Sequence, residues 1–533
     1  MIPLHLHSNN TFLTGTIPIP VIIDKCIEYG IKKIGLTDTN SMHGVIEFAK
    51  TAIKKNIKPI IGSLISSPEN EKDYVILLAR NNIGYSDLCK VITSRKLNDD
   101  FSLIELFNQK LDNLYLITPS IHLLQKIKSS DKIFIELITT KSEKQNNRDR
   151  YQFAIENGFA FIASNPVYFA DKSDYLLHKA ITAIRLKTTI DNLEDDDAVN
   201  EEFYFKDPKI LEREWNSLPS ALSNSETIAN DCNVDLKLGE YKFPVFSSPT
   251  DTTADNLLWN KSFEGLTKRY QVITDRAEKR LQTELAVISE MGFSNYFLIV
   301  WDIVNEAKRR GMMTIGRGSA ANSLVSYCLE ITQIDPLLHN LYFERFLNKA
   351  RSSPPDFDID FSWKERDEII KYIFEKYGYE NVAMISTTVT FRARSAFREI
   401  AKAFGFTNDE ISKFSKRIPW TDAANLPHIS ELFPESKGLN FKKEPWKTIV
   451  GLASRIARFP RHLSIHPGGI VITPTKITNY VALEYAKNKG LGLIVTQPDM
   501  YSIEDLGLIK IDILSQRSLG VLRDTMESIK QTE

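Results

Sequence analysis

The segment PPDFDIDF, residues 354–361, decides how this chain is interpreted. Three aspartates alternate in it with three apolar residues: Asp356, Phe357, Asp358, Ile359, Asp360 and Phe361. On a β-strand, a period of two puts the carboxylates on one face and the apolar side chains on the other, against a core. Like charges side by side cost energy unless cations neutralise them, and oxygen ligands suit Mg²⁺. The segment predicts a cation-binding strand; the alternative is an acidic edge strand or loop.

A second segment, GLIKIDIL (507–514), has the same alternation. Its isoleucines share one face, whereas Lys510 and Asp512 share the other. If this strand pairs with the aspartate strand in one sheet, the polar pair faces the same side. Lys510 could then neutralise a triphosphate while Asp512 completes the ion site, although a surface Lys/Asp pair is an equally good interpretation of this segment alone.

The third segment is MMTIGRGSAANSLVSYCL (312–329), in which a glycine turn precedes a predicted helix. The helix would place Leu324, Val325 and Cys328 on its inner face. A glycine turn that opens a helix presents backbone N–H groups and a positive dipole end to an anion, and Arg317 would add a fixed cation. The turn precedes the aspartate strand by about 40 residues, which is typical of the layout of a nucleotidyltransferase palm.

The whole chain, 533 residues long, predicts two to four domains. Residues 1–205 alternate β-rich runs with helical stretches, which predicts a β/α layered or barrel domain. The predicted strands are IGLT (34–37), KPIIGS (58–63), YVILLA (74–79), YLIT (115–118), IFIEL (133–137) and FAFIAS (159–164). Residues 206–290 are predicted to form a helical connector that includes a linker, SSPTDTTADN (247–256).

Composition gives no sign of a polyanionic partner, since 67 Lys and Arg balance 68 Asp and Glu. The four cysteines lie far apart without metal-ligand spacing, which indicates buried thiols in a reducing compartment. The N-terminus lacks the basic and apolar regions of a secretory signal, and no apolar run reaches the length of a membrane span. We therefore expect a cytoplasmic protein without a membrane partner.

These segments, with GFSNYFLIVWDIVNEAKRRG (292–311) and LYFERFLN (341–348), resemble the bacterial DNA polymerase III alpha subunit, a C-family DNA polymerase that functions in DNA replication. The resemblance implies a multidomain α/β chain with a polymerase beta-type mixed-sheet palm and a helical thumb. The palm would occupy residues 291–405 and 469–533, and the thumb residues 406–468. TFRARSAFRE and RHLSIHPGGIVI are similar to the error-prone subfamily.

The resemblance also implies roles for particular residues. Asp358, Asp360 and Asp512 would be the catalytic carboxylates that hold two Mg²⁺ ions, Gly318 and Ser319 would line the incoming dNTP, and Lys510 would contact its triphosphate. The reaction would be in-line attack of a primer 3′-hydroxyl on the α-phosphate, with pyrophosphate leaving. Primer-template DNA and dNTPs are the implied partners. One departure from the family pattern, Asn322 in place of Gly, lies beyond the turn.

The segment TFRARSAFREIAKAFG (390–405) predicts an amphipathic helix. Arg394, Arg398 and Lys402 recur every four residues along one face, with Arg392 just before them. Such a stripe suits a DNA backbone or a nucleotide phosphate, and a solvated helix face is the alternative. For the two histidines of RHLSIHPGG (461–469), packing or phosphate contact is favoured over metal ligation.

The opening LHLHS (4–8) resembles the start of a PHP domain, a barrel phosphoesterase fold that in some polymerases binds metals and proofreads. His5 and His7 are spaced to coordinate one ion from one strand face. Other ligand positions are occupied by residues that cannot replace the ligands: Thr14, Thr39, Ser63, Leu64 and Tyr168. Although Asp38 and His178 persist, we expect a PHP-like barrel over residues 1–205 that has lost its metal site.

Two rivals to an intact polymerase remain. In the family, the fingers and the clamp-binding and oligonucleotide-binding regions follow the third aspartate, whereas only about twenty residues follow Asp512. The chain would then be an incomplete or non-catalytic module that extends primers poorly alone and reaches a sliding clamp and other replisome subunits only through the missing region. The second rival, a stand-alone PHP-type phosphoesterase or 3′–5′ exonuclease, would survive Asp358→Asn and be lost on His5→Ala.

Overall fold

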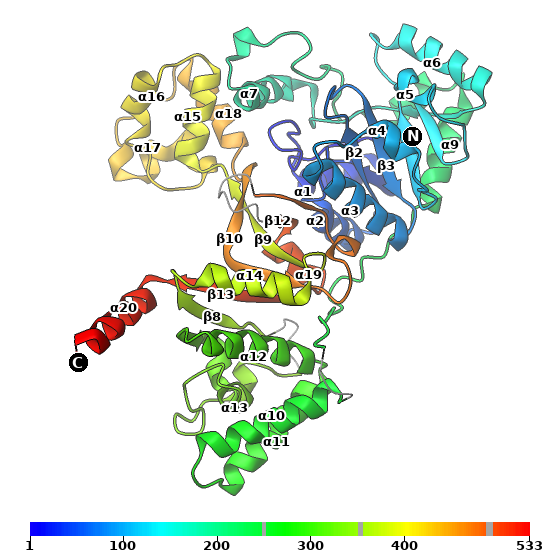
Figure 1. Ribbon diagram of the computed structural model, residues 1–533. Coiled ribbons are helices and arrows are strands. Elements are labelled where there is room, and N and C mark those ends of the chain that lie inside the picture. The colour runs from blue at the N-terminus through cyan, green and yellow to red at the C-terminus, as the bar shows by residue number, and fades with distance from the viewer. Residues whose placement is uncertain (248–251, 350–354, 487–493, 533) are drawn as a thin grey trace. The chain divides into compact units, whose positions relative to one another are not determined.

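The computed structural model describes residues 1–247, 252–349, 355–486 and 494–532 (Figure 1). The chain forms two compact units. Unit 1 comprises Met1–Leu236, Thr387–Ser464 and Val481–Glu484, and unit 2 comprises Lys237–Ser386, Ile465–Tyr480 and Tyr485–Glu533. Residues 248–251 of the predicted linker, and Pro354 of the aspartate segment, lie outside the described residues.

Unit 1 contains a sheet whose strands follow the chain in order from β1 to β6 (Figure 1). The strands are β1 (Lys33–Leu36), β2 (Lys58–Ser66), β3 (Tyr74–Ala79), β4 (Leu114–Thr118), β5 (Ile133–Ile138) and β6 (Ala160–Ser164). β3 runs antiparallel to both of its neighbours, and the other pairs are parallel. All six predicted strands are thereby confirmed, because each apolar run was short, β-branched and bounded by polar residues.

The N-terminal segment joins the two edges of this sheet. On one side, the backbone N–H groups of Gly35 and Thr37 donate to the carbonyls of Pro3 and Leu6. On the other side, the partner is Val167, just after β6. The backbone N–H of His7 donates to the carbonyl of Val167, and the N–H of Val167 donates to the carbonyl of His5. These bonds extend the open, mixed sheet into a half-barrel, in part agreement with the β/α layered or barrel domain that was predicted.

Helices cover this sheet and build a second core in the same unit. They are α1 (Ile19–Tyr29), α2 (Val45–Lys54), α3 (Asn82–Leu97), α4 (Leu103–Phe107), α5 (Ile121–Leu124), α6 (Lys144–Asn157), α7 (Tyr175–Leu186), α8 (Pro208–Glu214), α9 (Pro219–Asp231), α15 (Ala393–Ala403), α16 (Asn408–Ser415), α17 (Ile429–Leu432) and α18 (Trp446–Arg455). The predicted amphipathic helix is α15, whose buried face packs with α7 and α18 in the second core. The unit boundary therefore falls after Ser386, earlier than the palm–thumb boundary predicted at 405/406, because the apolar face of α15 is buried here.

The second sheet has the order β11-β12-β9-β10-β13-β8-β7 (Figure 1). Its strands are β7 (Thr314–Arg317), β8 (Asp358–Ser362), β9 (Val382–Thr390), β10 (Pro460–Ile472), β11 (Leu483–Tyr485), β12 (Ile494–Asp499) and β13 (Lys510–Gln516). β9 and β10 each contain residues of both units. β10 begins at Pro460, so the end of the region predicted as helical thumb, 406–468, is a strand. The first half of β10 is largely polar, which concealed the strand in the sequence.

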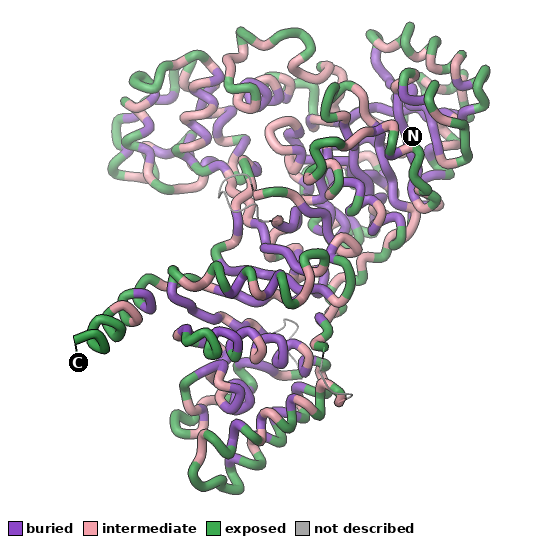
Figure 2. Tube along the Cα trace, viewed as in Figure 1, coloured by how far each residue is buried: buried purple, intermediate pink, exposed green. Residues whose placement is uncertain are grey.

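Unit 2 places helices and one large core around this sheet. The helices are α10 (Ala254–Arg269), α11 (Asp275–Glu290), α12 (Ser294–Arg309), α13 (Leu324–Cys328), α14 (Arg366–Tyr377), α19 (Met500–Asp505) and α20 (Arg517–Thr532). The apolar alternate residues of β8 and β13, among them Ile359, Phe361, Ile511 and Ile513, are buried in this core. Figure 2 shows these strands as mainly buried and most of α20 as exposed.

Two further features bear on the predictions. The four cysteines are buried and unpaired, as predicted, and burial raises the pKa of each thiol to about 12. Among the described residues, no single helix is long and apolar enough to cross a membrane; α11 and α12, bent by 113° at their junction, pass that test together by length and composition only.

Candidate active site

The two aspartate-bearing strands, β8 and β13, are parallel neighbours in the second sheet. Asp512 lies beside Asp358 in the register, and Leu514 lies beside Asp360. Because side chains alternate along a strand, Asp358, Asp360 and Asp512 share one face, and the isoleucines between them are in the core. The condition on which the sequence interpretation depended, that the two strands pair in one sheet, is therefore met.

Basic side chains lie against these carboxylates. Arg317, at the end of β7, pairs in register with Asp358, and its Nε lies 3.3 Å from Oδ1 of Asp360. Lys510 Nζ lies 3.0 Å from Oδ2 of Asp512 and 3.6 Å from Oδ1 of Asp356. Arg317 and Lys510, predicted as phosphate contacts, thus neutralise part of the carboxylate charge.

The electrostatics of the site indicate that the carboxylates are not fully neutralised. Burial, and then the carboxylate of Asp512, raise the pKa of Asp358. Burial acts to lower the pKa of Lys510, but the carboxylates of Asp512 and Asp356 outweigh it and raise that pKa. Glu504, on α19, also has a raised pKa, caused first by burial and in part by Asp356 and Asp512. Negative charge therefore accumulates at this face of the sheet.

Two carboxylate oxygens in the site lack a hydrogen-bond donor among the described residues. They are Oδ1 of Asp360 and Oδ1 of Asp512, and both are buried. The first lies 3.3 Å from Arg317 Nε, which forms an ion pair with it but no hydrogen bond. A buried acceptor without a donor is costly unless a cation or another donor satisfies it. Within the described part of the chain, no three His, Cys, Asp or Glu side chains converge as a ready metal chelate. The donor type and the unsatisfied oxygens fit a hard divalent cation, but Arg317 and Lys510 would have to give up contacts with the carboxylates.

The glycine turn lies directly beside these aspartates. Gly318 has a φ of +72°, and a Cβ at this position would lie 3.4 Å from Oδ2 of Asp358. Gly316 is equally constrained, since a Cβ there would lie 2.1 Å from the carbonyl oxygen of Ile331. Both glycines are therefore required by local geometry, one by a left-handed conformation and the other by a close backbone approach.

The helix predicted after this turn is much shorter than expected. Residues Gly318–Asn322, including Ser319, form a single 3-10 segment, and α13 that follows has five residues. The predicted inner face is confirmed, since Leu324, Val325 and Cys328 are buried. A dipole argument for anion binding does not apply to so short a helix, because the macrodipole needs several aligned turns. Any phosphate contact here would depend on backbone N–H groups and Arg317.

Sequence reasoning missed the residue that holds this turn in place. Glu284, fully buried on α11, accepts hydrogen bonds from Ser323 Oγ at 2.8 Å and from the backbone N–H of Val325 at 3.1 Å. Arg280 pairs with it at 2.6 Å and donates to the carbonyls of Asn322 and Leu341. Burial raises the pKa of Glu284 in spite of these bonds. The only signal in the sequence was an acidic residue on the apolar side of a helix.

His466, on β10, lies near the third aspartate. Its Nδ1 accepts a hydrogen bond from the backbone N–H of Gly469 at 2.6 Å, and Gly469 is the register partner of Asp512. Nδ1 also lies 3.6 Å from Oδ1 of Asp512. Because the Nδ1 lone pair already accepts from Gly469, this contact does not satisfy the aspartate oxygen. Packing, one of the roles predicted for this histidine, fits these bonds.

The predicted basic stripe lies on α15 in unit 1, and several of its members have protein partners. Arg394 donates to the carbonyl of Ile418, and Arg398 donates to Ser415 and Asn408. Arg392 lies over the exposed ring of Trp420, 5.4 Å from its centroid, and Lys402 lies 3.6 Å from Glu399. These contacts give the arginines a structural role within unit 1. Their contact with DNA stays a prediction.

The residues of the predicted PHP site are buried and contact one another through hydrogen bonds. His5 Nδ1 contacts Glu136 at 2.7 Å, the two Nε2 atoms of His5 and His7 are 3.1 Å apart, and the ring of Tyr168 stacks on His7 at 4.1 Å. Glu136, which sequence analysis missed, also accepts from Tyr74 Oη at 2.8 Å. Burial acts to raise the pKa of Glu136, but His5 outweighs it and the pKa is lowered. In the sequence, the only indication of this buried residue was that Glu136 is a single acidic residue inside the apolar strand IFIEL.

The other two persisting residues are also committed to protein partners. Asp38 accepts three hydrogen bonds, from the backbone N–H and hydroxyl of Ser8 and from Thr11, and burial raises its pKa to about 6. His178 Nδ1 donates to the carbonyl of Thr14 at 2.9 Å, and its Nε2 accepts from the N–H of Val199 at 3.1 Å. Neither histidine nitrogen is left for a metal.

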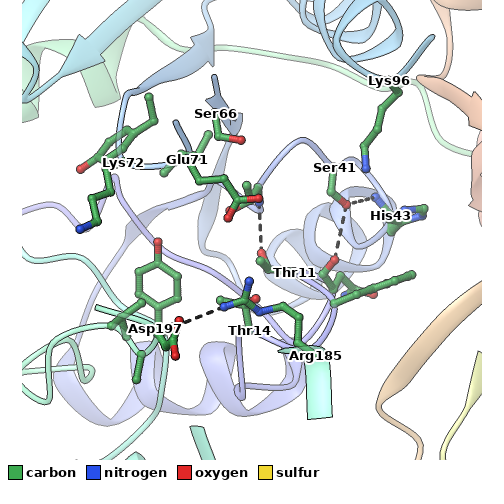
Figure 3. A pocket seen from close by; sticks show the side chains of 18 of the residues that line it. Thr11, Thr14, Ser41, His43, Ser66, Glu71, Lys72, Lys96, Arg185 and Asp197 are labelled. Atoms are coloured by element: carbon green, nitrogen blue, oxygen red, sulfur yellow. Dashed lines mark hydrogen bonds between the residues drawn. The ribbon is translucent and has the colours of Figure 1, made fainter. Parts of the chain in front are cut away.

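A cavity of about 430 Å³ lies beside this network in unit 1 (Figure 3). Its described lining includes Thr11, Thr14, Thr39, Tyr168 and Arg185, and does not include His5, His7, Glu136 or Asp38. Figure 3 shows Arg185 directed toward Asp197 at the edge of this cavity. The histidines are therefore buried behind hydroxyl-bearing side chains and are not exposed to the cavity.

Comparison with known proteins agrees with this architecture. The family described as "Bacterial DNA polymerase III alpha NTPase domain" matches residues 256–515, and the PHP domain family matches residues 3–168. The first match contains β7, β8 and all of β13 except Gln516, and the second contains the six-stranded sheet. The chain thus carries a PHP domain followed by a domain of the bacterial DNA polymerase III alpha family.

Individual relatives can be compared with the chain over nearly its whole length. The error-prone DNA polymerase of Symbiobacterium thermophilum is 30% identical over 99% of this chain and 52% of the relative. The DNA polymerase III alpha subunits of Bacillus subtilis and Escherichia coli O6:H1 are 32% and 31% identical, each over 99% of this chain and 49% of the relative. The chain is similar to the bacterial DNA polymerase III alpha subunit, as predicted, and spans about half the length of the curated relatives it matches.

Proposed function

We propose that this chain is the catalytic-site-bearing half of a template-directed DNA polymerase, which adds dNTPs to a primer 3′-hydroxyl. The observation that carries the proposal is the pairing of Asp358 with Asp512 on adjacent parallel strands, with Asp360 on the same face. The unsatisfied oxygens of Asp360 and Asp512 support a cation at this face. The family match over residues 256–515 supports the same activity.

Mg²⁺ is the cation that we assign to the site, with Asp358, Asp360 and Asp512 as its ligands. When bound, two such ions would supply charge stabilisation to the attacking and the leaving oxygens of an in-line displacement. Each carboxylate would hold its position through strand pairing, since β8 and β13 are fixed by their ladder and by the buried isoleucines. The primer oxygen would bond to the α-phosphorus, and the bond to pyrophosphate would break.

The basic residues would change partners when substrate binds. Arg317 and Lys510 contact Asp360 and Asp512 in this structure. Once cations neutralise the carboxylates, the guanidinium and the ammonium would be free to contact triphosphate oxygens. Gly318 and Ser319 would bring their backbone N–H groups close to the phosphates, because a glycine allows the backbone to approach a ligand.

A non-catalytic or incomplete module is the second candidate function. It is favoured by one observation, that the aligned relatives are about twice as long as this chain. In that case, synthesis would need the polypeptide that corresponds to the rest of the relatives' length. Contacts with a sliding clamp or other replisome subunits would then belong to that additional part.

A primer-extension assay separates these proposals. The chain would be assayed with Mg²⁺ and primer-template DNA, alone and with the polypeptide that corresponds to the remaining half of a relative. Asp358→Asn and Asp512→Asn test the site, and Asp367→Asn on the exposed surface of α14 is the matched control. We expect weak extension alone, restored extension in the mixture, and loss of extension only in the site variants.

Three results would each overturn one of these proposals. Extension that is undiminished in the Asp358→Asn and Asp512→Asn variants would exclude the assigned site. Robust Mg²⁺-dependent extension by the chain alone would exclude the incomplete module, whereas no extension in any mixture would exclude polymerase activity.

A further inference from the structure

Tyr296, on α12, is a buried residue that contacts both aspartate-bearing segments. It was not among the predicted site residues. Its side chain is fully buried in the core of unit 2. Its ring packs against Phe357, with the centroids 5.2 Å apart and the rings inclined at 57°. This packing accounts for an aromatic ring at the position, but not for the polar oxygen that the ring carries into the core.

The side chain of Tyr296 contacts both aspartate-bearing segments. Its hydroxyl donates to the carbonyl oxygen of Lys510 at 2.9 Å, and its ring packs on Phe357. Phe357 directly precedes Asp358, and Lys510 is two residues before Asp512. A single side chain therefore joins the two segments at the point where the catalytic aspartates begin.

The strand ladder explains why a side chain is needed here. The register of β8 with β13 runs from Asp358 and Asp512 to Ser362 and Gln516. Before this ladder, the backbone N–H of Asp512 donates to the carbonyl of Phe357 at 3.0 Å. The Lys510 carbonyl lies at the end of the ladder, where an unpaired buried backbone group would be costly. The phenol hydroxyl satisfies this carbonyl.

The hydroxyl keeps its proton in this position. Burial, and then the carboxylates of Asp356, Asp512 and Asp358, hold the pKa of Tyr296 well above its ordinary value. A phenol that stays protonated can donate to the Lys510 carbonyl at every physiological pH. The raised pKa adds to a protonation that a phenol already has at neutral pH, so the donor is available throughout that range.

We propose that the Tyr296 hydroxyl is a positioning group that sets the spacing of Asp358 and Asp512, and thereby the affinity of the site for a divalent cation. This inference rests on the proposed function, because it takes the aspartates to be cation ligands. Tyr296 contacts backbone, not substrate, and so acts through the aspartates. Groups of this kind, one step removed from the metal ligands, commonly change metal affinity by about 10- to 100-fold when they are removed.

The test is Tyr296→Phe, which removes one oxygen atom and keeps the ring. Tyr372→Phe is the matched control, because Tyr372 Oη donates to Asp302 at 2.8 Å in the same unit, and Tyr377 supplies a second donor to that carboxylate. Mn²⁺ would be titrated into each variant of the full chain and followed by electron paramagnetic resonance. The thermal midpoint would be measured in parallel.

Binding at the site is defined as the Mn²⁺ binding that an Asp358→Asn/Asp512→Asn double variant loses. We expect Tyr296→Phe to weaken this binding by about tenfold and Tyr372→Phe to leave it unchanged, while both lower the thermal midpoint by similar amounts. A merely structural role for Tyr296 would lower the midpoint without the change in Mn²⁺ affinity, and that result would overturn the inference.

The failure of the inference and the failure of the proposed function give different results. If the double aspartate variant binds Mn²⁺ as the unmodified chain does, the assigned cation site is wrong and the proposed function loses its basis. If the double variant loses binding but Tyr296→Phe keeps full affinity, only the role of Tyr296 is wrong. Equal weakening by Tyr296→Phe and Tyr372→Phe would also refute it, since the effect would then be general.

Discussion

His178 offers a quantitative test of the interpretation that the PHP-like site is structural. Its Nδ1 donates to the Thr14 carbonyl, and its Nε2 accepts from the Val199 N–H, so the imidazole is neutral and both nitrogens are used. Burial lowers its pKa to about 4. We expect His178→Gln, whose amide also carries one donor and one acceptor, to remove the pH dependence that this group causes.

The sign and size of the effect follow from proton linkage. Below its ordinary pKa of 6.5 the histidine binds a proton in the unfolded chain but not in the folded one, so its contribution to stability is full above pH 6.5 and falls as the pH drops toward 4. At pH 5 the loss amounts to about 2 kcal/mol. Asp38 acts in the opposite direction, because its pKa is raised to about 6 in the folded state. Asp38 is present in both proteins, so its effect cancels in the comparison.

The assay is urea denaturation at pH 8 and pH 5, followed through hydrogen exchange of peptides from α7 so that unit 1 is observed separately. The free energy of unfolding of the original chain, relative to His178→Gln, should fall by about 2 kcal/mol between the two pH values. His428→Gln, at an exposed position, should show no such change. A difference between the chain and His178→Gln that stays constant with pH would refute the buried, neutral histidine.

Three further predictions concern the other sites. Gly318→Ala should weaken nucleotide binding, measured by isothermal titration, because a side chain at a positive φ costs about 1 kcal/mol and its Cβ would lie 3.4 Å from Asp358; unchanged affinity would show that the turn does not contact nucleotide. Glu284→Ala should lower stability by about 3 kcal/mol, measured by thermal unfolding, because it leaves two buried donors without an acceptor and removes the carboxylate that pairs with Arg280; a change under 1 kcal/mol would contradict its role. Arg394→Ala should lower stability by about 1 kcal/mol, whereas Lys402→Ala, in an exposed ion pair, should not; if DNA affinity, measured by fluorescence anisotropy, is also unchanged in both, the stripe is structural.

Sequence reasoning succeeded where the pattern was local. The alternation in β8 and β13 predicted which side chains are buried, because a strand has a period of two whatever surrounds it. The same holds for the six strands of unit 1 and for the buried face of α15. Gly318 could be identified because a left-handed turn requires glycine. In each case, residues near in sequence carried all the information.

Other features depended on contacts between distant residues. The buried Glu284 and Glu136 appeared in the sequence as ordinary acidic residues, and their roles arise only because Ser323 and His5 are brought to them. The assignment of α15 to unit 1 could not be predicted, because the partner of its apolar face could not be identified from its periodicity. The first half of β10 was missed for a similar reason, since its polar residues are held in the sheet by neighbouring strands.

The amino-acid sequence by itself determined the family, the strands that carry the aspartates, and the face on which each aspartate lies. Only the tertiary structure decided that β8 and β13 are parallel neighbours with Asp358 beside Asp512, and that Tyr296 joins them. The reason is physical: periodicity specifies the direction of a side chain relative to its own strand, whereas strand pairing depends on packing between residues about 150 positions apart in the chain.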